Sequence, residues 1–139
     1  MQLPQHLEDK FTQLLGRYPV KRSALIPMML YAQDALGFLG DPIVEEIAQR
    51  LDLKVLEVKE TLAYYSMLHR HPMGKNHVQI CTNVSCMLRG GREMYEYVQK
   101  KMGIGNKQVT PDGNFSLEEV ECIGACTGAP ALQVNYDYY

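Results

Sequence analysis

The residues with the clearest chemical potential are four cysteines in the second half of the chain: Cys81, Cys86, Cys122 and Cys126. Four residues separate the first two, 35 residues follow, and three residues separate the last two. The second pair lies in the stretch ECIGACTGAP, whose two glycines and proline argue against a regular helix. This pattern predicts two thiol-bearing loops rather than one helical face.

The cysteine spacing is compatible with several chemistries. A zinc finger usually supplies ligands as C-x2-C pairs, and a thioredoxin-type dithiol needs C-x-x-C; neither occurs here. Four thiolates from glycine-rich loops suit an iron–sulfur cluster, because glycine lets backbone N–H groups approach the sulfur atoms. A structural zinc site and free, redox-sensing thiols remain the alternatives.

The bulk composition narrows the class of protein. The chain has 139 residues, 46% of them hydrophobic, which is enough for one ordinary core or two small ones. The net charge is −2 with mixed signs, so no basic stripe points to nucleic acid. The N-terminus MQLPQHLEDKF lacks a signal-peptide pattern, and no apolar run approaches the ~20 residues that span a membrane. We therefore expect a cytoplasmic protein without direct membrane insertion, whose reduced thiols bind metal or do redox chemistry.

The first half reads as a helical domain covering residues 1–74. Apolar periodicity predicts helices at 5–17, 24–36, 43–51 and 54–69. Ser23 is the expected N-cap of the second helix, and Pro42 is expected at the first position of the third. The stretch 71–75, HPMGK, breaks the pattern and marks the boundary.

Residues 75–139 change to a mixed pattern. We predict a strand within 77–83, a helix at 88–102, a hairpin formed by 107–110 and 115–123, and a last strand at 131–136. The cysteines then fall at strand ends. The fold class expected for the whole chain is α+β.

Three stretches, CTNVSCMLRGG, TPDGNFSLEEVECIGACTGAP and LQVNYDYY, resemble the 24 kDa-type flavoprotein subunit of respiratory complex I. In bacteria this family is the E-type subunit of NADH–quinone oxidoreductase. The resemblance extends back through LGFLGDPIVEEIAQRL and VKETLAYYSML. It implies an N-terminal helical bundle followed by a thioredoxin-like α/β [2Fe-2S] ferredoxin domain. NAD-linked hydrogenases and formate dehydrogenases carry a similar subunit, and the cysteine motifs do not separate these assemblies.

The resemblance also implies a role in electron transfer. It makes Cys81, Cys86, Cys122 and Cys126 the ligands of one [2Fe-2S] cluster. The cluster would exchange single electrons with FMN on a flavoprotein subunit that also binds NADH. Further partners would be other subunits of a peripheral arm at the inner face of the cell membrane. The chain has no G-x-G-x-x-G or P-loop motif, so we predict neither an NADH site nor catalytic residues in it.

Two expectations concern the surroundings of the cluster. We expect each cysteine pair to bind one iron, because each loop delivers its two sulfurs to one place. We also expect the acidic residues Glu118, Glu119 and Glu121 to lower the reduction potential.

Other features have simpler interpretations. Residues 40–65 resemble a helix-turn-helix, but the charges of the second helix sum to zero, which favours helix packing over DNA binding. His69 and His71 favour a solvated turn over a metal site. We expect the amphipathic residues 1–20 to precede the compact bundle and to lie along the flavin subunit. The tyrosine-rich end NYDYY is expected to be a contact surface.

Overall fold

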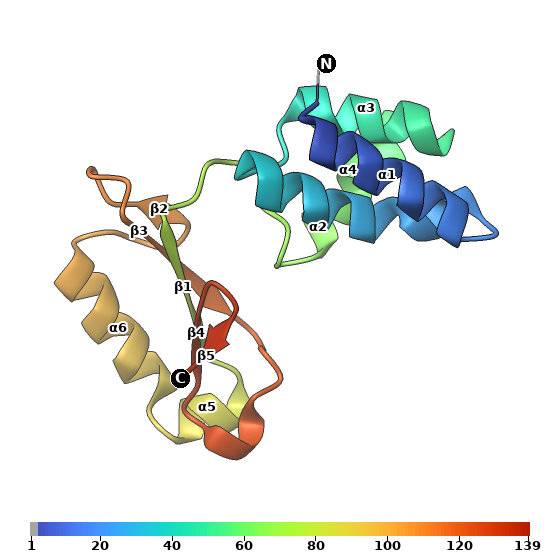
Figure 1. The fold of residues 1–139 in the computed structure, drawn as a ribbon. Helices are drawn as coiled ribbons and strands as arrows, with labels where there is room; N and C mark the ends of the chain where they lie inside the picture. The colour runs from blue at the N-terminus through green and yellow to red at the C-terminus, as the bar shows by residue number, and fades with distance from the viewer. Residues whose placement is uncertain (1–2) are drawn as a thin grey trace. The chain divides into compact units, whose positions relative to one another are not determined.

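The computed structural model describes residues 3–139, which form two compact units (Figure 1). The first unit ends at Pro72, and the second runs from Met73 to Tyr139. The predicted boundary lay after residue 74, and its meaning as a boundary between functional domains stays a prediction. None of the described helices is long and apolar enough to cross a membrane.

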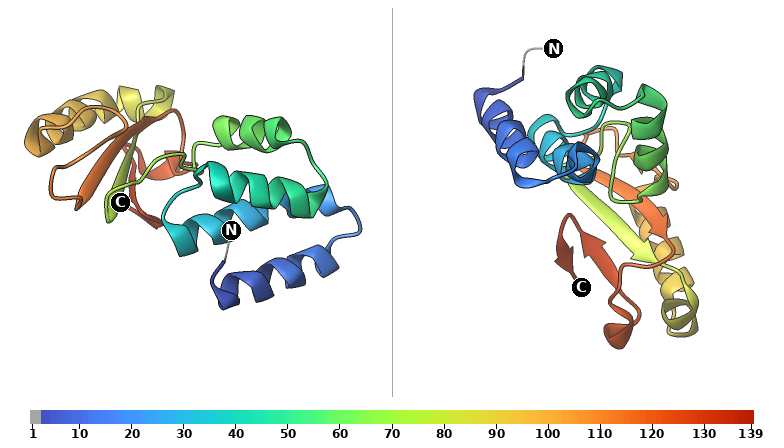
Figure 2. Two further views of the ribbon diagram at one scale, coloured as in Figure 1. Left: turned by 90° about the horizontal axis from the view of Figure 1, so that it is seen from above. Right: turned by 90° about the vertical axis from the view of Figure 1, so that its right-hand side faces the viewer.

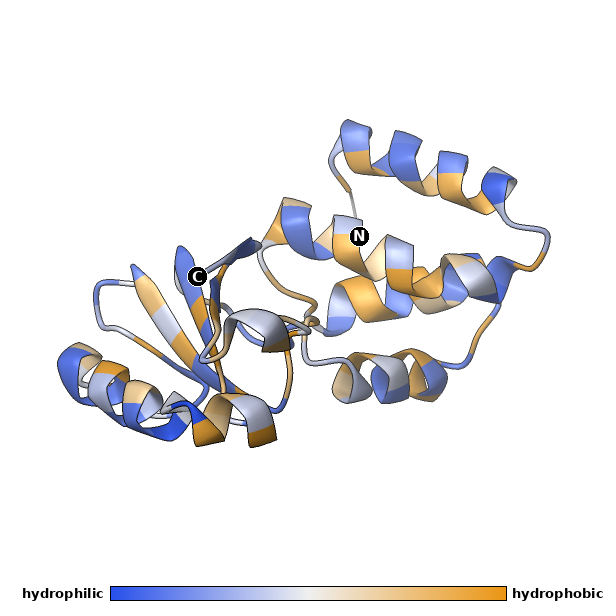
Figure 3. Cartoon of the chain, turned by 90° about the horizontal axis from the view of Figure 1, so that it is seen from below, coloured by the Kyte–Doolittle hydropathy of each residue, from blue (hydrophilic) through white to orange (hydrophobic). Residues whose placement is uncertain are grey.

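The first unit is a helical bundle. Its elements are α1 (Gln5–Arg17), the 3-10 helix η1 (Lys21–Ala24), α2 (Leu25–Leu36), α3 (Asp41–Leu51) and α4 (Val55–Tyr64). Hydrophobic stripes alternate with hydrophilic ones along the helices, as amphipathic packing requires (Figure 3). In α1, the side chains of Leu7, Phe11 and Leu14 are buried in the bundle core. Helix α1 is therefore part of the bundle rather than a segment that precedes it; its contact with a flavin subunit stays a prediction.

The predicted ends of two helices were wrong. Ser23 lies inside η1, and Ala24 occupies the cap position of α2 without a side-chain hydrogen bond. The helix predicted at 54–69 ends at Tyr64. The reason is the buried side chain of Gln33, which donates to the carbonyl of Met67 (2.9 Å) and accepts from the N–H of His69 (2.6 Å). These bonds require a non-helical backbone after Tyr64.

An ionic contact links α1 to α3. The guanidinium of Arg50 donates two hydrogen bonds of 2.7 Å to the carboxylate of Glu8, and its Nε donates to Glu46 at 2.8 Å. The guanidinium also lies 5.4 Å from the ring centroid of Phe11. The hydrogen bond from Arg50 lowers the pKa of Glu8.

The second unit is built on a five-stranded mixed sheet. Its elements are β1 (Asn76–Cys81), α5 (Val84–Leu88), α6 (Gly91–Met102), β2 (Gln108–Val109), β3 (Phe115–Val120), the 3-10 helix η2 (Cys126–Gly128), β4 (Leu132–Val134) and β5 (Asp137–Tyr138). The strand order is β2-β3-β1-β4-β5. Strands β1 and β3 are parallel, with Cys81 opposite Val120, and the other pairs are antiparallel. The predicted α+β class is confirmed.

Helix α6 covers one face of this sheet (Figure 2). Val78, Ile80 and Leu117 point to this face and form its core with Tyr95 and Ile104. Because side chains alternate along a strand, the neighbouring residues of β1 and β3 point to the opposite face. That second face carries the buried polar residues His77, Gln79, Ser116 and Glu118.

Turn geometry explains where the predicted elements of the second unit differ from the observed ones. The helix predicted at 88–102 is two helices, because Gly90 has a left-handed backbone (φ 94°) between α5 and α6. The strand predicted at 131–136 is a hairpin of β4 and β5, which turns through Asn135 (φ 55°). The hairpin predicted across 107–123 is confirmed, although β2 has only two residues.

Candidate metal centre

The sheet brings the two cysteine pairs to one edge. Cys81 is the last residue of β1, and Cys122 follows the end of β3 by two positions. Because β1 and β3 are parallel, their carboxyl ends lie side by side at this edge. Cys86 lies in α5, and Cys126 begins η2. All four are free thiols; Cys81 and Cys86 are buried, whereas Cys122 and Cys126 are exposed.

Helix α5 directs Cys86 inward. The side chain of Asn83 caps the helix by accepting a hydrogen bond from the N–H of Val84 at 2.8 Å. Cys86 is buried on the inner side of this single turn, while Val84 and Leu88 are exposed on its outer side. A cysteine five positions after Cys81 therefore returns toward it, because the chain turns through a capped helix.

Gly91 fixes how α6 packs beneath the first pair. A Cβ atom at this position would lie 2.6 Å from the carbonyl oxygen of Cys81 and 2.8 Å from that of Cys86. Both distances are too short for any side chain. Glycine is therefore required for the start of α6 to contact both cysteine carbonyls.

The second loop places backbone groups next to sulfur. Gly124 has φ 75°, a left-handed backbone that favours glycine, and its N–H donates to Cys122 Sγ at 3.3 Å. The thiol of Cys81 donates to the carbonyl of Glu121 at 3.5 Å. Ala131 is buried beside Cys81, and its carbonyl accepts a hydrogen bond from the N–H of Cys81 at 3.2 Å. The first cysteine is thus bonded to backbone on both sides of the second cysteine pair.

The thiols interact mainly within their pairs. Burial raises the pKa of Cys81 most, and the hydrogen bond and charge of Cys86 raise it further. The charge of Cys122, followed by its hydrogen bond, raises the pKa of Cys126. Between the pairs only weaker charge interactions act. Cys81 and Cys126 are therefore protonated at neutral pH unless a cation stabilises their thiolate forms.

The geometry of the four sulfurs suits two metal ions better than one. A single tetrahedral zinc ion with Zn–S bonds of about 2.3 Å would hold all four sulfurs within about 4 Å of one another. In residues 3–139, no three of these sulfurs lie within 4.8 Å of one another. The donor set, two thiol pairs with a backbone N–H directed at sulfur, fits a two-iron cluster.

One side of the centre is open. A depression of about 450 Å³ lies beside the second loop, lined by Ser85, Leu88, Arg89, Cys126, Thr127 and Ala129. The pair formed by Cys81 and Cys86 faces the protein interior, and the other pair faces this open side. An electron partner can therefore approach the centre from the side of Cys126.

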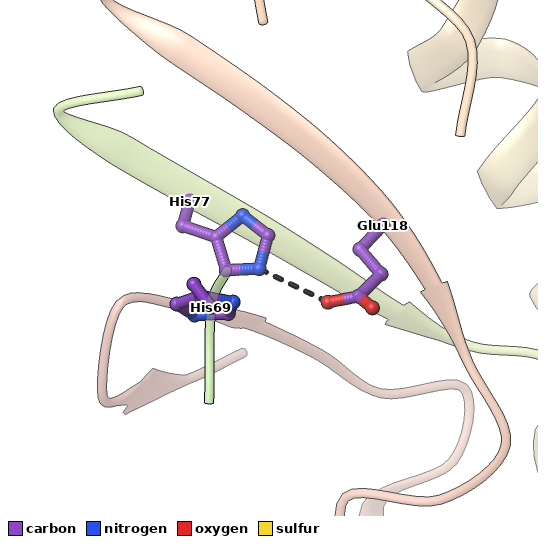
Figure 4. A group of neighbouring side chains, drawn as sticks. All are labelled: His69, His77 and Glu118. Carbon is purple, nitrogen blue, oxygen red and sulfur yellow. Dashed lines mark hydrogen bonds and ion pairs between the residues drawn. The ribbon is translucent and has the colours of Figure 1, made fainter. Parts of the chain in front are cut away.

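The three acidic residues expected near the centre occupy different environments. Glu118 is buried, and its carboxylate accepts hydrogen bonds from His77 and Gln79 (Figure 4). Glu119 is exposed and accepts a 2.7 Å hydrogen bond from the hydroxyl of Thr82. Glu121 has an exposed side chain, and only its carbonyl is bonded to a cysteine.

The sequence interpretation missed the roles of Asn83, Gly91 and the buried polar face. Asn83 precedes a helix that was too short for its apolar periodicity to be recognised. The polar residues of β1, at alternate positions in HVQIC, were a detectable signal that one face of a central strand is polar.

The thioredoxin-like [2Fe-2S] ferredoxin family model matches residues 11–139. The chain belongs to this family. The predicted resemblance is thereby confirmed, and membership supports an iron–sulfur cluster in this ferredoxin-family chain. It does so independently of the sulfur geometry.

Two relatives illustrate the similarity, and both are E-type subunits of an NADH-quinone oxidoreductase. The one from Rhizobium meliloti, the second of this type in its numbering, is 40% identical over 133 residues, which cover 96% of this chain and 79% of the relative. The one from Rickettsia bellii is 40% identical over 129 residues, which cover 91% of this chain and 77% of the relative. The similarity therefore extends across both units of the ferredoxin-family chain.

A solved structure supports the fold. A chain of an NAD+-reducing [NiFe]-hydrogenase in the air-oxidized state aligns with a TM-score of 0.67 at 19% identity. The match covers 81% of the ferredoxin-family chain, which spans only 19% of the hydrogenase chain. At this identity the similarity concerns the fold alone.

Proposed function

We propose that the chain is the electron-transfer subunit of an NADH–quinone oxidoreductase and holds one [2Fe-2S] cluster through Cys81, Cys86, Cys122 and Cys126. The observation that carries this proposal is the delivery of two thiol pairs by the carboxyl ends of the parallel strands β1 and β3. The names of the relatives at 40% identity support the assignment to a quinone oxidoreductase. The hydrogenase similarity, at 19% identity, adds no function to it.

Each residue of the centre has a defined role in this proposal. Cys81 and Cys86 bind one iron from the buried side, where the packed side chains exclude water. Cys122 and Cys126 bind the other iron on the open side. The N–H of Gly124 stabilises negative charge on the sulfur of Cys122. When bound, a [2Fe-2S] cluster takes up and releases one electron at a time.

The proposed partner is a flavoprotein subunit that binds FMN and NADH. The absence of a nucleotide-binding motif from the sequence supports this division of labour. We propose that residues 75–139 carry the cluster and residues 1–74 contact other subunits of the peripheral arm, at the inner face of the cell membrane. The tyrosine-rich end belongs to the same contact surface, since Tyr136, Tyr138 and Tyr139 are all exposed.

Co-expression with the flavoprotein encoded in the same genome tests this function. The expected result is a complex that contains FMN, and in which NADH produces the electron paramagnetic resonance signal of a reduced [2Fe-2S] cluster. The isolated chain should be reduced by dithionite but not by NADH. A complex with a hydrogenase flavoprotein instead, or a colourless protein with one zinc ion, would contradict the proposal.

A further inference from the structure

A continuous hydrogen-bond chain runs through the buried polar face of the sheet. The N–H of Gly74 donates to the hydroxyl of Ser116 at 3.0 Å, and this hydroxyl lies 2.8 Å from Nδ1 of His77. Nε2 of His77 lies 3.2 Å from the carboxylate of Glu118 (Figure 4), which also accepts a 3.0 Å hydrogen bond from Gln79. His77, Gln79 and Glu118 are each less than 9% exposed, and Ser116 is fully buried.

The order of donors and acceptors makes His77 neutral in this chain. An ionised carboxylate only accepts hydrogen bonds, so Nε2 of His77 carries a hydrogen. The hydroxyl of Ser116 already accepts from Gly74 and can donate its own hydrogen to Nδ1. A protonated Nδ1 would compete for the same hydroxyl and leave its hydrogen without this acceptor. Three neutral groups thus lead to one charged residue.

Glu118 therefore adds a buried negative charge with little compensation. Burial opposes its ionisation, but the hydrogen bonds from His77 and Gln79 outweigh burial, and the pKa of Glu118 is lowered. The ammonium group of Lys107 lies 3.8 Å from the carboxylate, on a side chain that is 72% exposed. Water screens such an exposed cation, so the carboxylate keeps most of its field inside the protein.

The strand register places this charge close to the cysteine centre. Glu118 is opposite Gln79, and Cys81 is two residues further along β1. Two strand residues span about 6.6 Å, and adjacent strands are about 4.8 Å apart, so the backbone of Glu118 lies about 8 Å from that of Cys81. Gln79, Cys81 and Glu118 also share one face of the sheet, because they alternate with the residues that contact α6.

We infer that Glu118 is an electrostatic determinant of the cluster's reduction potential, held in place by Gln79 and the chain from Gly74 through Ser116 and His77. This inference rests on the proposed function and singles out one of the three acidic residues expected to act. A fixed negative charge disfavours the added electron, so Glu118 lowers the potential. Glu119 and Glu121 have exposed side chains, which water screens.

The test is the midpoint potential of the reconstituted full chain with Glu118→Gln, which keeps the shape of the side chain but removes its charge. We expect a higher potential than in the wild type, with an unchanged visible spectrum. Glu119→Gln is the matched control, because its position is adjacent and its charge is exposed; its shift should be clearly smaller. Glu118→Asp retains the charge and should restore a potential near that of the wild type.

Two further variants keep the inference testable. If Glu118→Gln does not take up iron, Glu118→Met provides a second uncharged side chain of similar length with the same expected rise. His77→Gln removes a neutral group and should leave the potential nearly unchanged. Equal potentials for wild type and uncharged variants, or an equal shift in Glu119→Gln, would overturn the inference. A wild-type protein without iron and sulfide would instead overturn the proposed function.

Discussion

At the residue scale, the four cysteines are unequal partners. Cys81 and Cys86 are each 2% exposed and packed against Val120 and Ala131, whereas Cys122 and Cys126 are exposed. Burial raises the pKa of Cys81, so its thiolate depends on the charge of a bound metal. The buried pair anchors the centre, and the exposed pair completes it.

This inequality predicts different results for serine variants of the two pairs. Cys86→Ser replaces a buried ligand and should abolish cluster assembly, with less than about a tenth of the wild-type iron and sulfide retained. Cys126→Ser should retain a labile cluster with a shifted visible spectrum, because an exposed alkoxide ligand can still reach the iron. Ser85→Ala, adjacent to Cys86 and exposed, is the control and should be normal. Full iron content in Cys86→Ser would show that Cys86 is not a ligand.

At the element scale, the start of α6 has no space for a side chain beneath the first cysteine pair. In Gly91→Ala the new Cβ would lie 2.6 Å from the carbonyl oxygen of Cys81, so α6 or the end of β1 must move. We expect a loss of stability of about 1–3 kcal/mol, as for other overpacked sites, and a lower yield of cluster. Thermal unfolding and iron content measure both effects.

Gly128→Ala is the matched control for Gly91→Ala. Gly128 lies in η2 near the same centre, but an added Cβ there meets no atom within 4 Å. Its φ is not positive, so alanine is not strained. If both variants lose stability equally, close packing of α6 on the cysteine carbonyls is not the cause.

The contact between α1 and α3 predicts a pH dependence of stability. The hydrogen bond from Arg50 lowers the pKa of Glu8 in the folded state. A lowered pKa contributes stability above the unfolded-state value of about 4.3 and loses it as the pH falls through the folded-state value. Arg50→Ala should therefore lower the melting temperature more at about pH 7 than at about pH 3. An equal decrease at both pH values would assign the effect to lost packing on Phe11 instead.

The elements also show what sequence periodicity can predict. Long amphipathic segments such as α1 were predicted correctly, because their apolar faces pack within their own unit. Boundaries failed where a distant side chain determined the backbone, as Gln33 does for the end of α4. The cysteine positions were visible in the sequence, but their exposure and the contact of Gly91 depend on strand register and could not be read from it.

At the scale of the whole molecule, each unit has its own buried core. The core of the first unit consists mainly of helical residues, and the second unit combines the α6 face of the sheet with the cluster of residues around Cys81. All four cysteines and every contact assigned to the centre belong to the second unit. The centre therefore needs no side chain from the first unit.

This separation predicts that residues 73–139 assemble the cluster alone. The isolated unit should show the visible spectrum of the full chain after reconstitution, although it should melt at a lower temperature because small domains bury less surface. It should also lose part of its affinity for the flavoprotein, if the helical unit contacts other subunits as proposed. A folded fragment that takes up no iron would show that the first unit is required for the centre.

The most direct test of the central claim is analysis of the full chain purified without oxygen. Iron, zinc and acid-labile sulfide would be measured together with the electron paramagnetic resonance spectrum before and after dithionite. We predict about two irons and two sulfides per chain, and a signal only in the reduced state. One zinc ion per chain without sulfide, and no signal after attempted reconstitution with iron and sulfide, would contradict an electron-carrying cluster.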